Sequence, residues 1–336
     1  MKEHTSTASS SARQVADRRL SDVCEERRDF ARAARFYLQL DPKQLPSRFL
    51  YDALGSALFD AICHLPWYRI TRAELQLLQR HAATFGHVFR EGGRVVELGC
   101  GNGEKLATLL THADVPGVHA HLIDLSEAAL ARSVQTLAAI EGLEIRVTTH
   151  QAPYEDGLLA LPTENAHPTL VAFLGSNIGN FDPPGAAEFL HDLRTSLNKD
   201  DGLLIGVDLV KPRRQLLLAY DDPLGVTAAF NRTLLVRINR ELGAAIDLDG
   251  FSHRALWNEA ESRVEMHLVA RSPQPMSIPR AHTDIHLDAG EAIWTESSYK
   301  YAPEQIAQLL RSVAFEPIAQ WIDQQDGFAL TLAKAA

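Results

Sequence analysis

The stretch Val95-Val96-Glu97-Leu98-Gly99-Cys100-Gly101-Asn102-Gly103-Glu104-Lys105 decides the fold of this chain. A β-branched run enters a turn with a glycine at every second position, and a helical pattern follows over residues 105–110. Glycine suits such a turn because the backbone bends tightly and lets a ligand approach without an intervening Cβ. The dinucleotide fingerprint G-x-G-x-x-G needs a glycine at position 104, where this chain has Glu104. The spacing therefore argues against a dinucleotide-dependent oxidoreductase.

A second acidic residue follows the next predicted strand. The run Val118–Ile123 ends in Asp124, and Ser126 begins a helical pattern. A carboxylate at this place can accept hydrogen bonds from both hydroxyls of a ribose. The motif E-L-G-x-G-x-G with this second acid resembles the S-adenosylmethionine-dependent methyltransferases, and it implies S-adenosylmethionine as the cofactor. Glu97, Gly99, Gly101 and Gly103 form the motif itself.

Composition places the chain among ordinary globular proteins. It has 336 residues, of which 46% are hydrophobic and 23% charged. A net charge of −10 without any cluster of Lys and Arg argues against a nucleic-acid partner. The 3 cysteines fit a reducing cytoplasm, and the 14 histidines lack the spacing of paired ligands, so we expect no metal. We also expect no membrane span, a monomer, and a disordered tail over residues 1–25.

Seven strands are predicted from position 94 onward. They are Arg94–Leu98, Val118–Leu125, Glu144–Gln151, Thr169–Ser176, Gly202–Leu209, Glu316–Asp323 and Phe328–Lys334. Several are continuous apolar runs, as in strands buried on both faces of a parallel sheet. Helical patterns separate them, with Ser126 and Asp182 as predicted N-caps. The short link of residues 324–327 predicts an antiparallel hairpin at the end.

These elements predict an α/β fold with a doubly wound, seven-stranded, Rossmann-like sheet. About a hundred residues between the fifth and sixth strands exceed what a crossover needs. We therefore predict a methyltransferase domain over residues 80–210 plus 300–336. An additional α+β substrate-binding subdomain is predicted over residues 26–79 plus 211–299.

Further motifs converge on one family. They are Tyr51–Phe59, Leu65–Tyr68, Thr71–Glu74, Phe173–Phe181, Ala219–Asp222, Thr227–Asn231, Val264–His267 and Ile293–Lys300. Together they resemble the L-histidine Nα-methyltransferases of ergothioneine biosynthesis, which trimethylate histidine to hercynine. The resemblance runs from about position 40 to the end of the chain.

The resemblance implies a role for each matching residue. Lys105, Asp124 and Gly99 match cofactor contacts, with Tyr154 as the aromatic residue beside the adenine. The implied substrate residues are Tyr51, Phe59, Tyr68, Gly175, Asn180, Tyr220, Met266, Glu296 and Ser298. Among these, Glu296 and Ser298 match the pair that recognises the imidazole. Asn180 would orient the α-amine, and Tyr51 would relay protons.

The chemistry of these residue types agrees with an amino-acid substrate. Tyrosine hydroxyls and an asparagine amide can bind the substrate carboxylate without a cation that would repel the sulfonium. A carboxylate such as Glu296 accepts a hydrogen bond from an imidazole N–H, worth roughly 1.5–3 kcal/mol. Gly175 leaves room for an amine that gains methyl groups.

Two segments depart from the family pattern. The family often reads Pro-Glu-Tyr-Tyr-Pro-Thr-Arg where this chain has Pro66-Trp67-Tyr68-Arg69-Ile70-Thr71-Arg72. Where an acid-aromatic pair usually meets the adenine, this chain has Pro153-Tyr154, so that the place of the acid falls on Pro153.

We therefore predict a cytoplasmic, S-adenosylmethionine-dependent N-methyltransferase that acts on the α-amine of L-histidine, up to trimethylation. One alternative is an Nα-methyltransferase for another amino acid, such as a tryptophan derivative, or one that stops at one or two methyl groups. A second alternative is a cofactor-binding protein without activity, against which Asn180, Tyr220 and Glu296 argue.

Overall fold

The computed structural model describes residues 24–85, 93–113, 115, 117–161 and 168–336. The predicted tail falls almost wholly outside the described residues, but residues 24 and 25 already belong to a helix over 24–37. The chain forms two compact units. Among the described residues, the smaller unit comprises those within 24–49, 231–253 and 267–295, and the larger unit comprises those within 50–230, 254–266 and 296–336.

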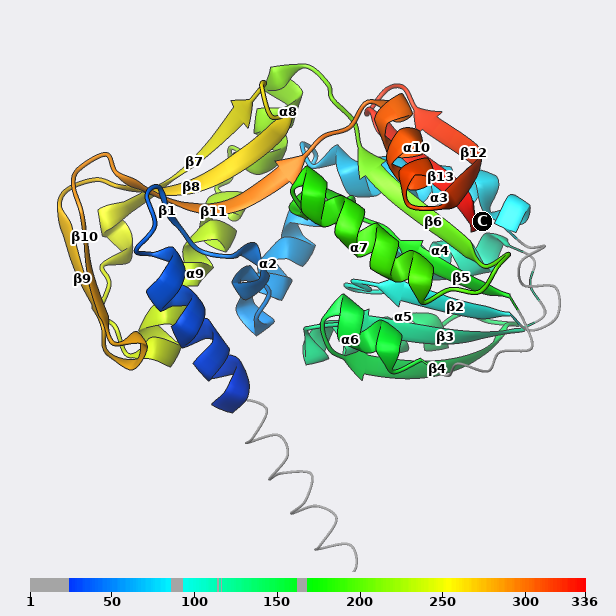
Figure 1. Ribbon diagram of the computed structural model, residues 1–336, viewed down its shortest axis with the longest axis horizontal. Helices are drawn as coiled ribbons and strands as arrows, with labels where there is room; N and C mark the ends of the chain where they lie inside the picture. Colours follow the sequence, from blue (N-terminus) through cyan, green and yellow to red (C-terminus); the bar gives the residue numbers. More distant parts are fainter. Residues whose placement is uncertain (1–23, 86–92, 114, 116, 162–167) are drawn as a thin grey trace, which may run out of the picture. The chain divides into compact units, whose positions relative to one another are not determined.

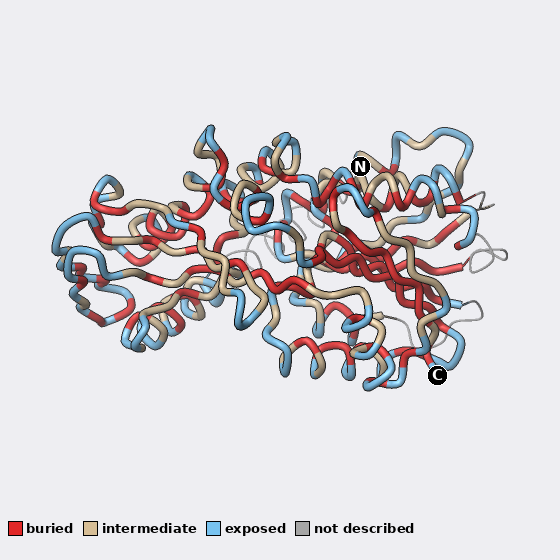
Figure 2. Tube along the Cα trace, turned by 90° about the horizontal axis from the view of Figure 1, so that it is seen from above, coloured by how far each residue is buried: buried red, intermediate tan, exposed pale blue. Residues whose placement is uncertain are grey.

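A seven-stranded sheet forms the centre of the larger unit, as predicted (Figure 1). Its spatial order is β12-β13-β6-β5-β2-β3-β4, and only β13 runs antiparallel to both of its neighbours. The strands are β2 (Arg94–Leu98), β3 (Gly117–Asp124), β4 (Glu144–Gln151), β5 (Thr169–Phe173), β6 (Gly202–Asp208), β12 (Phe315–Asp323) and β13 (Phe328–Ala335). Strands β2, β5 and β6 are buried along their whole length, which explains their continuous apolar sequences (Figure 2).

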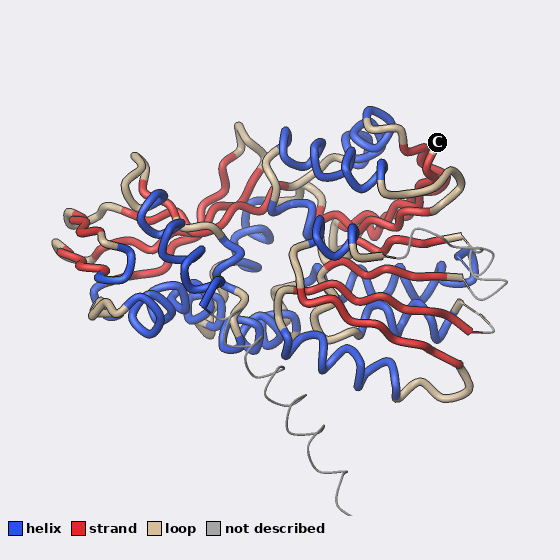
Figure 3. Tube along the Cα trace, turned by 60° about the horizontal axis from the view of Figure 1, so that its bottom comes forward, coloured by secondary structure: helices blue, strands red, loops and turns tan. Residues whose placement is uncertain are grey.

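Helices cover both faces of this sheet (Figure 3). One face carries α6 (Tyr154–Leu159), α7 (Pro183–Thr195) and α10 (Pro303–Ser312). The other face carries α3 (Arg69–Phe85), α4 (Glu104–His112) and α5 (Glu127–Ala138). The predicted caps are confirmed: the Ser126 side chain accepts a hydrogen bond from Ala129 N, and the Asp182 side chain accepts one from Gly185 N. The doubly wound α/β fold is therefore confirmed.

One predicted strand end is wrong by several residues, for a local reason. Strand β5 stops at Phe173 rather than residue 176, because Gly175 and Ser176 adopt left-handed backbone angles of φ 79° and 59°.

The remaining elements of the larger unit position the site described below. They are η1 (Ser47–Leu50, ending in this unit), α2 (Ala53–Cys63), η3 (Asn177–Asn180), α8 (Arg213–Tyr220) and the first residues of α9 (Val226–Leu242). Helix α3 packs on α4 and on β13, which is why residues 50–79 belong with the sheet. The compact units thus differ from the predicted domain boundaries, which separated this segment from the sheet.

The smaller unit has its own apolar centre. The rings of Phe30 and Phe49 lie 4.6 Å apart, and the Arg237 guanidinium lies over both. A four-stranded sheet has the order β1-β11-β8-β7, and β7, β8 and β11 each contribute residues to both units. The strands of this sheet are β1 (Lys43–Gln44), β7 (Phe251–Asn258), β8 (Arg263–Ala270) and β11 (Ala292–Tyr299). Strands β9 (Gln274–Ile278) and β10 (Thr283–Leu287) form a separate two-stranded sheet. Short 3₁₀ turns, η4 (Leu248–Gly250) and η5 (Pro279–Ala281), precede β7 and β10.

Candidate active site

The glycine turn after β2 has the geometry that its sequence requires. Gly99, Gly101 and Gly103 have φ angles of 73°, 55° and 77°, a left-handed region that other residues rarely adopt. A Cβ on Gly99 would lie 2.7 Å from Asn177 Nδ2 and 2.8 Å from Tyr154 Oη. A Cβ on Gly101 would meet nothing within 4 Å. The turn is therefore open at Gly101 and closely bordered by side chains at Gly99.

Asp124 lies beside this turn at the end of β3. Its Oδ1 accepts a hydrogen bond from Ser126 N at 2.9 Å, and its Oδ2 accepts one from Gly101 N at 3.2 Å. Burial raises the pKa of this carboxyl group, while the two backbone N–H groups oppose the shift. The structure thus brings the predicted ribose-binding acid to the glycine turn.

Glu97, the last but one residue of β2, is 1% exposed. Its Oε2 has no hydrogen-bond partner among the described residues. Burial raises the pKa of Glu97 to about 8, although the Lys105 ammonium counteracts the shift. An unpartnered buried carboxylate oxygen is unfavourable unless a ligand supplies a donor. The residues present therefore fit a cofactor that carries an ammonium group, as the methionine part of S-adenosylmethionine does.

We expect Glu97→Gln to stabilise the cofactor-free protein at alkaline pH. The folded protein binds more protons than the unfolded chain between about pH 4.5 and 8, so wild-type stability falls as the pH rises through this window. Glutamine has no proton to lose, and its advantage should reach on the order of 5 kcal/mol at high pH. Urea unfolding at about pH 5 and 8.5 measures the difference between the two proteins. A wild-type protein that is the more stable of the two at the higher pH would contradict the assignment.

Lys105 and Gly175 share a partner that sequence reasoning missed. Lys105 Nζ lies 2.9 Å from Glu74 Oε2, and Gly175 N donates to both oxygens of Glu74 at 2.9 and 2.8 Å. Burial opposes the charge of Lys105, but the Glu74 carboxylate raises the pKa of Lys105. Glu74 itself is fully buried in α3, and a Cβ on Gly206 would lie 1.9 Å from it. The available signal was that Glu74 follows the apolar Ile70 by four residues, a spacing that places both on one face of a helix.

Tyr154 begins α6, and its hydroxyl borders the glycine turn at Gly99. Pro153 is the N-cap residue and provides no side-chain hydrogen bond. Two acidic residues, Glu155 and Asp156, lie in the first turn of the same helix. The chain therefore has carboxylates near the place where the family pattern has its acid, but they come one and two residues after Tyr154 instead of directly before it.

One cavity in the larger unit gathers every predicted substrate residue. These residues are Tyr51, Phe59, Tyr68, Gly175, Asn180, Tyr220, Met266, Glu296 and Ser298. Six further residues complete the lining: Ile62, Ser176, Asn177, Ala219, Thr227 and Phe230. All of these six except Ile62 lie inside the sequence motifs quoted above, which were the signal that could have found them.

Aromatic rings form one wall of the cavity. The ring centroid of Phe59 lies 5.6 Å from that of Tyr51, 5.9 Å from Phe230 and 6.2 Å from Tyr68. The Tyr68 and Tyr220 rings are 6.4 Å apart. Burial raises the pKa of the Tyr51 and Tyr68 hydroxyls well above the ordinary value, so both remain protonated at neutral pH. They can therefore donate hydrogen bonds to a substrate carboxylate.

Asn180 ends the η3 turn that follows β5. The N-cap of the next helix is Asp182, so Asn180 does not serve as the helix cap. Its side chain belongs to the cavity lining together with Gly175, whose φ of 79° turns the chain at this point. The predicted amine-orienting residue thus borders the space beside Gly175.

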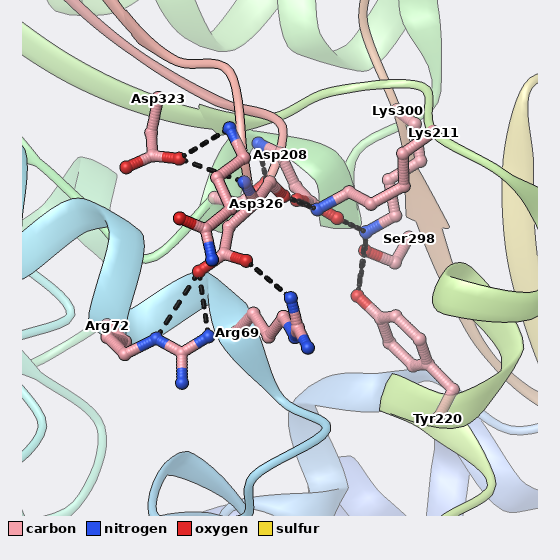
Figure 4. A network of polar contacts seen from close by, with 11 residues as sticks. Arg69, Arg72, Asp208, Lys211, Tyr220, Ser298, Lys300, Asp323 and Asp326 are labelled. Carbon is pink, nitrogen blue, oxygen red and sulfur yellow. Dashed lines mark hydrogen bonds and ion pairs between the residues drawn. The ribbon is translucent and has the colours of Figure 1, made fainter.

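A charged group lies behind the polar end of the cavity. Lys300 Nζ is 2.7 Å from Tyr220 Oη and 2.8 Å from Ser298 Oγ (Figure 4). It also forms an ion pair of 3.0 Å with Asp208. In the described part of the chain, the cavity lining itself has hydroxyl and amide groups and no lysine or arginine, but the buried Lys300 contacts two of the lining hydroxyls from outside the cavity.

Glu296 lies at the same end of the cavity and is 9% exposed. Burial raises the pKa of Glu296 to about 7, and the Lys300 ammonium limits the rise. A carboxyl group with this pKa is ionised above neutral pH and can then accept a hydrogen bond from a ring N–H.

The segment that departs from the family pattern is held by ion pairs. Arg69 Nη1 lies 2.9 Å from Asp326 Oδ1, and Arg72 Nη2 lies 2.8 Å from Asp326 Oδ2 (Figure 4). Asp326 is 4% exposed in the turn between β12 and β13. Arg69, which stands where the family often has a tyrosine, thus ties the start of α3 to the sheet next to Tyr68.

Two further findings concern the described part of the chain. Within residues 24–85, 93–113, 115, 117–161 and 168–336, no group of three or more His, Cys, Asp or Glu side chains is arranged to hold a metal ion. No helix in that part combines the length and the apolar character needed to cross a membrane.

A Rossmann-like sheet with this glycine turn, the ribose-side acid and the adjoining cavity defines an S-adenosylmethionine-dependent methyltransferase. Residues 30–335 match the family model described as histidine-specific methyltransferase, SAM-dependent. The chain belongs to this family.

Individual relatives agree with this assignment. A histidine N-alpha-methyltransferase from Mycolicibacterium smegmatis is 39% identical over 305 residues, covering 90% of this chain and 94% of that protein. An ergothioneine biosynthesis protein 1 from Schizosaccharomyces pombe is 28% identical over 83% of this chain and 37% of its own length. A 4-dimethylallyltryptophan N-methyltransferase from Trichophyton verrucosum is 24% identical over 83% of this chain and 86% of its own.

Proposed function

We propose that this enzyme methylates the α-amine of L-histidine, up to the trimethylated product hercynine. The observation that carries the proposal is the convergence of the nine predicted substrate residues on one cavity. Its polar end presents Glu296 and Ser298, and its aromatic wall presents the hydroxyls of Tyr51 and Tyr68. We further infer a cytoplasmic monomer without a nucleic-acid partner, from the net charge of −10 and the composition.

We infer that each of the two predicted domains supplies part of the site. Residues 80–210 and 300–336 would supply the cofactor contacts, among them Glu97, Gly99, Lys105 and Asp124. Residues 26–79 and 211–299 would supply most substrate contacts. Bound S-adenosylmethionine offers a methyl group on a sulfonium, and the protein has to aim an uncharged amine at it.

Asn180 and Tyr51 would act on the amine. The Asn180 amide would orient the nitrogen so that its lone pair faces the methyl carbon, and such placement is the main contribution of the protein. Tyr51 stays protonated because burial raises its pKa, so it cannot act as a standing phenolate base. It would instead relay a proton, accepting the one that the amine loses while it passes its own to water.

The polar end of the cavity, with Glu296 and Ser298, is where the ring of the substrate would lie, and we call it the ring end. Its residues favour histidine over a tryptophan derivative. Glu296 is a buried acceptor for the N–H of an imidazole, and Ser298 can donate to the second ring nitrogen, which an indole does not have. Met266, which is 1% exposed, would pack beside the ring. The lower identity to the tryptophan-modifying relative, 24% against 39% for the histidine enzyme, points the same way.

Repeated methylation requires space beside the amine. Gly175 borders the cavity without a side chain, and its φ of 79° disfavours any other residue. A Cβ there would also lie 2.7 Å from Lys105 Nζ. The bulk of a dimethylated amine would therefore be accommodated next to Gly175.

Incubation of the purified protein with S-adenosylmethionine and each of the twenty amino acids tests the proposal. We expect one substrate, histidine, and a product mass that corresponds to three added methyl groups. Histidine products with one or two methyl groups would preserve the substrate assignment and contradict trimethylation. Product with another amino acid and none with histidine would overturn the proposed function.

A further inference from the structure

The ammonium group of Lys300 has no role in the function described so far. Lys300 follows β11, and its side chain is completely buried. Nζ lies 3.0 Å from Asp208 Oδ2, 2.7 Å from Tyr220 Oη and 2.8 Å from Ser298 Oγ (Figure 4). An ammonium group carries three hydrogens and accepts none. These three contacts therefore use all of its hydrogen-bonding capacity.

The contacts of Lys300 constrain the two hydroxyl groups. Tyr220 Oη and Ser298 Oγ lie 2.8 Å apart, and each already accepts a hydrogen from Lys300. Only one hydrogen fits between these two oxygens. A phenol is a much stronger acid than an aliphatic alcohol and hence the better donor, so Tyr220 donates to Ser298. Both lone pairs of Ser298 are then occupied, and its own hydrogen is left for the cavity.

We propose that Lys300 is a positioning residue that makes Ser298 a hydrogen-bond donor, so that the ring end of the cavity selects the neutral imidazole. This inference rests on the proposed function. Glu296 would accept from the single ring N–H, and Ser298 would donate to the other ring nitrogen, which must be unprotonated to accept.

An imidazolium at the same place would be disfavoured twice. Its second N–H would face Ser298, which has no lone pair left to accept it. Its charge would also approach a group that is already positive, because Lys300 and Lys211 share the single carboxylate of Asp208, at 3.0 and 2.6 Å. Among the described residues, the titratable and charged groups around the ring end come from several elements. They are Glu296 from β11, Lys300 and Tyr301 just after it, Tyr220 from α8, Tyr51 ahead of α2, Tyr68 ahead of α3, Asp208 from β6, and Lys211.

The test compares histidine with 3-(1,2,4-triazol-3-yl)alanine, whose ring has an N–H and a bare nitrogen but stays uncharged between about pH 5.5 and 8.5. We would measure kcat/KM for both substrates over this range and take their ratio. Titration of Glu296 changes kcat/KM by the same factor for both substrates, so it cancels in the ratio. Titration of the α-amine cancels for the same reason. The ratio therefore reports the protonation of the imidazole alone.

We expect the ratio of histidine to triazolylalanine to be level above about pH 7.5 and to fall about fivefold between about pH 6.5 and 5.5. A ratio that stays level, or that rises as the pH falls, would overturn the inference while methylation of histidine itself still stands. A protein that methylates histidine at no pH would overturn the proposed function and this inference with it.

Two lysine variants separate the role of Lys300 from a general effect of the ion-pair network. Lys300→Met frees one lone pair of Ser298, which can then accept a hydrogen bond from an imidazolium. The fall of the ratio on the acid side should therefore shrink to less than about threefold per pH unit. The variant should also raise KM for histidine by a larger factor than it lowers kcat. Lys211→Met removes one positive charge from beside Asp208 but leaves both hydroxyls and their contacts with Lys300 in place, so its acid-side fall should weaken less than that of Lys300→Met. A folded Lys300→Met protein with the wild-type profile would overturn the role of Lys300.

Folding of the variants is checked by thermal unfolding with and without S-adenosylmethionine. If Lys300→Met does not fold, Tyr220→Phe tests the same arrangement, because it removes the hydroxyl that donates to Ser298 and leaves Lys300 in place. Its acid-side fall should weaken in the same way, and an unchanged fall would contradict the proposed direction of the hydrogen bonds.

Discussion

Glu296→Ala is expected to raise KM for histidine about 10- to 100-fold with a smaller effect on kcat. The variant removes a charge-assisted hydrogen bond to the ring, which is worth roughly 1.5–3 kcal/mol. The carboxylate lies in the substrate cavity and not at the glycine turn, so the affinity for S-adenosylmethionine should not change. Initial rates at saturating cofactor give KM and kcat, and calorimetry gives the cofactor affinity.

Glu296→Gln is the matched control. Its amide oxygen still accepts a hydrogen bond from a ring N–H, so KM should rise by a smaller factor than in the alanine variant. Equal values of KM in Glu296→Ala and the wild type would remove this residue from the substrate site. A loss of cofactor affinity of the same size as the loss of histidine affinity would indicate general damage instead.

Glu74→Ala is expected to lower the free energy of unfolding by about 3–5 kcal/mol, the range for breaking a buried ion pair by removal of one partner. The variant would leave the Lys105 ammonium and the Gly175 N–H without the carboxylate that both contact. Urea unfolding measures the loss. Because Lys105 is a predicted cofactor contact, the affinity for S-adenosylmethionine should fall as well.

Glu74→Gln separates charge from shape, since its amide oxygen still accepts from Gly175 N but carries no charge for Lys105. It should lie between the wild type and the alanine variant in stability. The surface pair of Lys334 and Asp200 provides the control, because both side chains are well exposed and Asp200→Asn should produce no measurable change. A Glu74→Ala protein within about 1 kcal/mol of the wild type would show that the pair is dispensable.

The order and type of most elements could be predicted because their signals are local. Continuous apolar runs marked several strands of the seven-stranded sheet, and the predicted caps Ser126 and Asp182 begin α5 and α7. Strands such as β9 and β11 were missed because Pro275 and the polar run Thr295–Ser298 do not read as strands. Their pairing with neighbouring strands overrides that local preference.

The candidate site could be predicted only as a set of residues. The motifs identified Tyr51, Glu296 and Ser298, but their order along the chain gives no distance between them. Lys300 ended one of the motifs and received no role, since nothing in its neighbourhood along the chain shows that Asp208 faces it.

The sequence by itself determined the class of fold, the glycine turn, the acid at the end of the next strand and the family. Each depends on residue spacing within a few positions, because turns, caps and strand or helix periods involve only near neighbours along the chain. The tertiary structure alone decided which buried charges meet. Glu74 binds Gly175 across 101 positions, and Lys300 reaches Tyr220 across 80, because the crossovers of a parallel sheet bring distant segments to one edge. The contact of Lys300 with Tyr220 and Ser298 sets the direction of the hydrogen bonds that we propose for the ring end of the cavity.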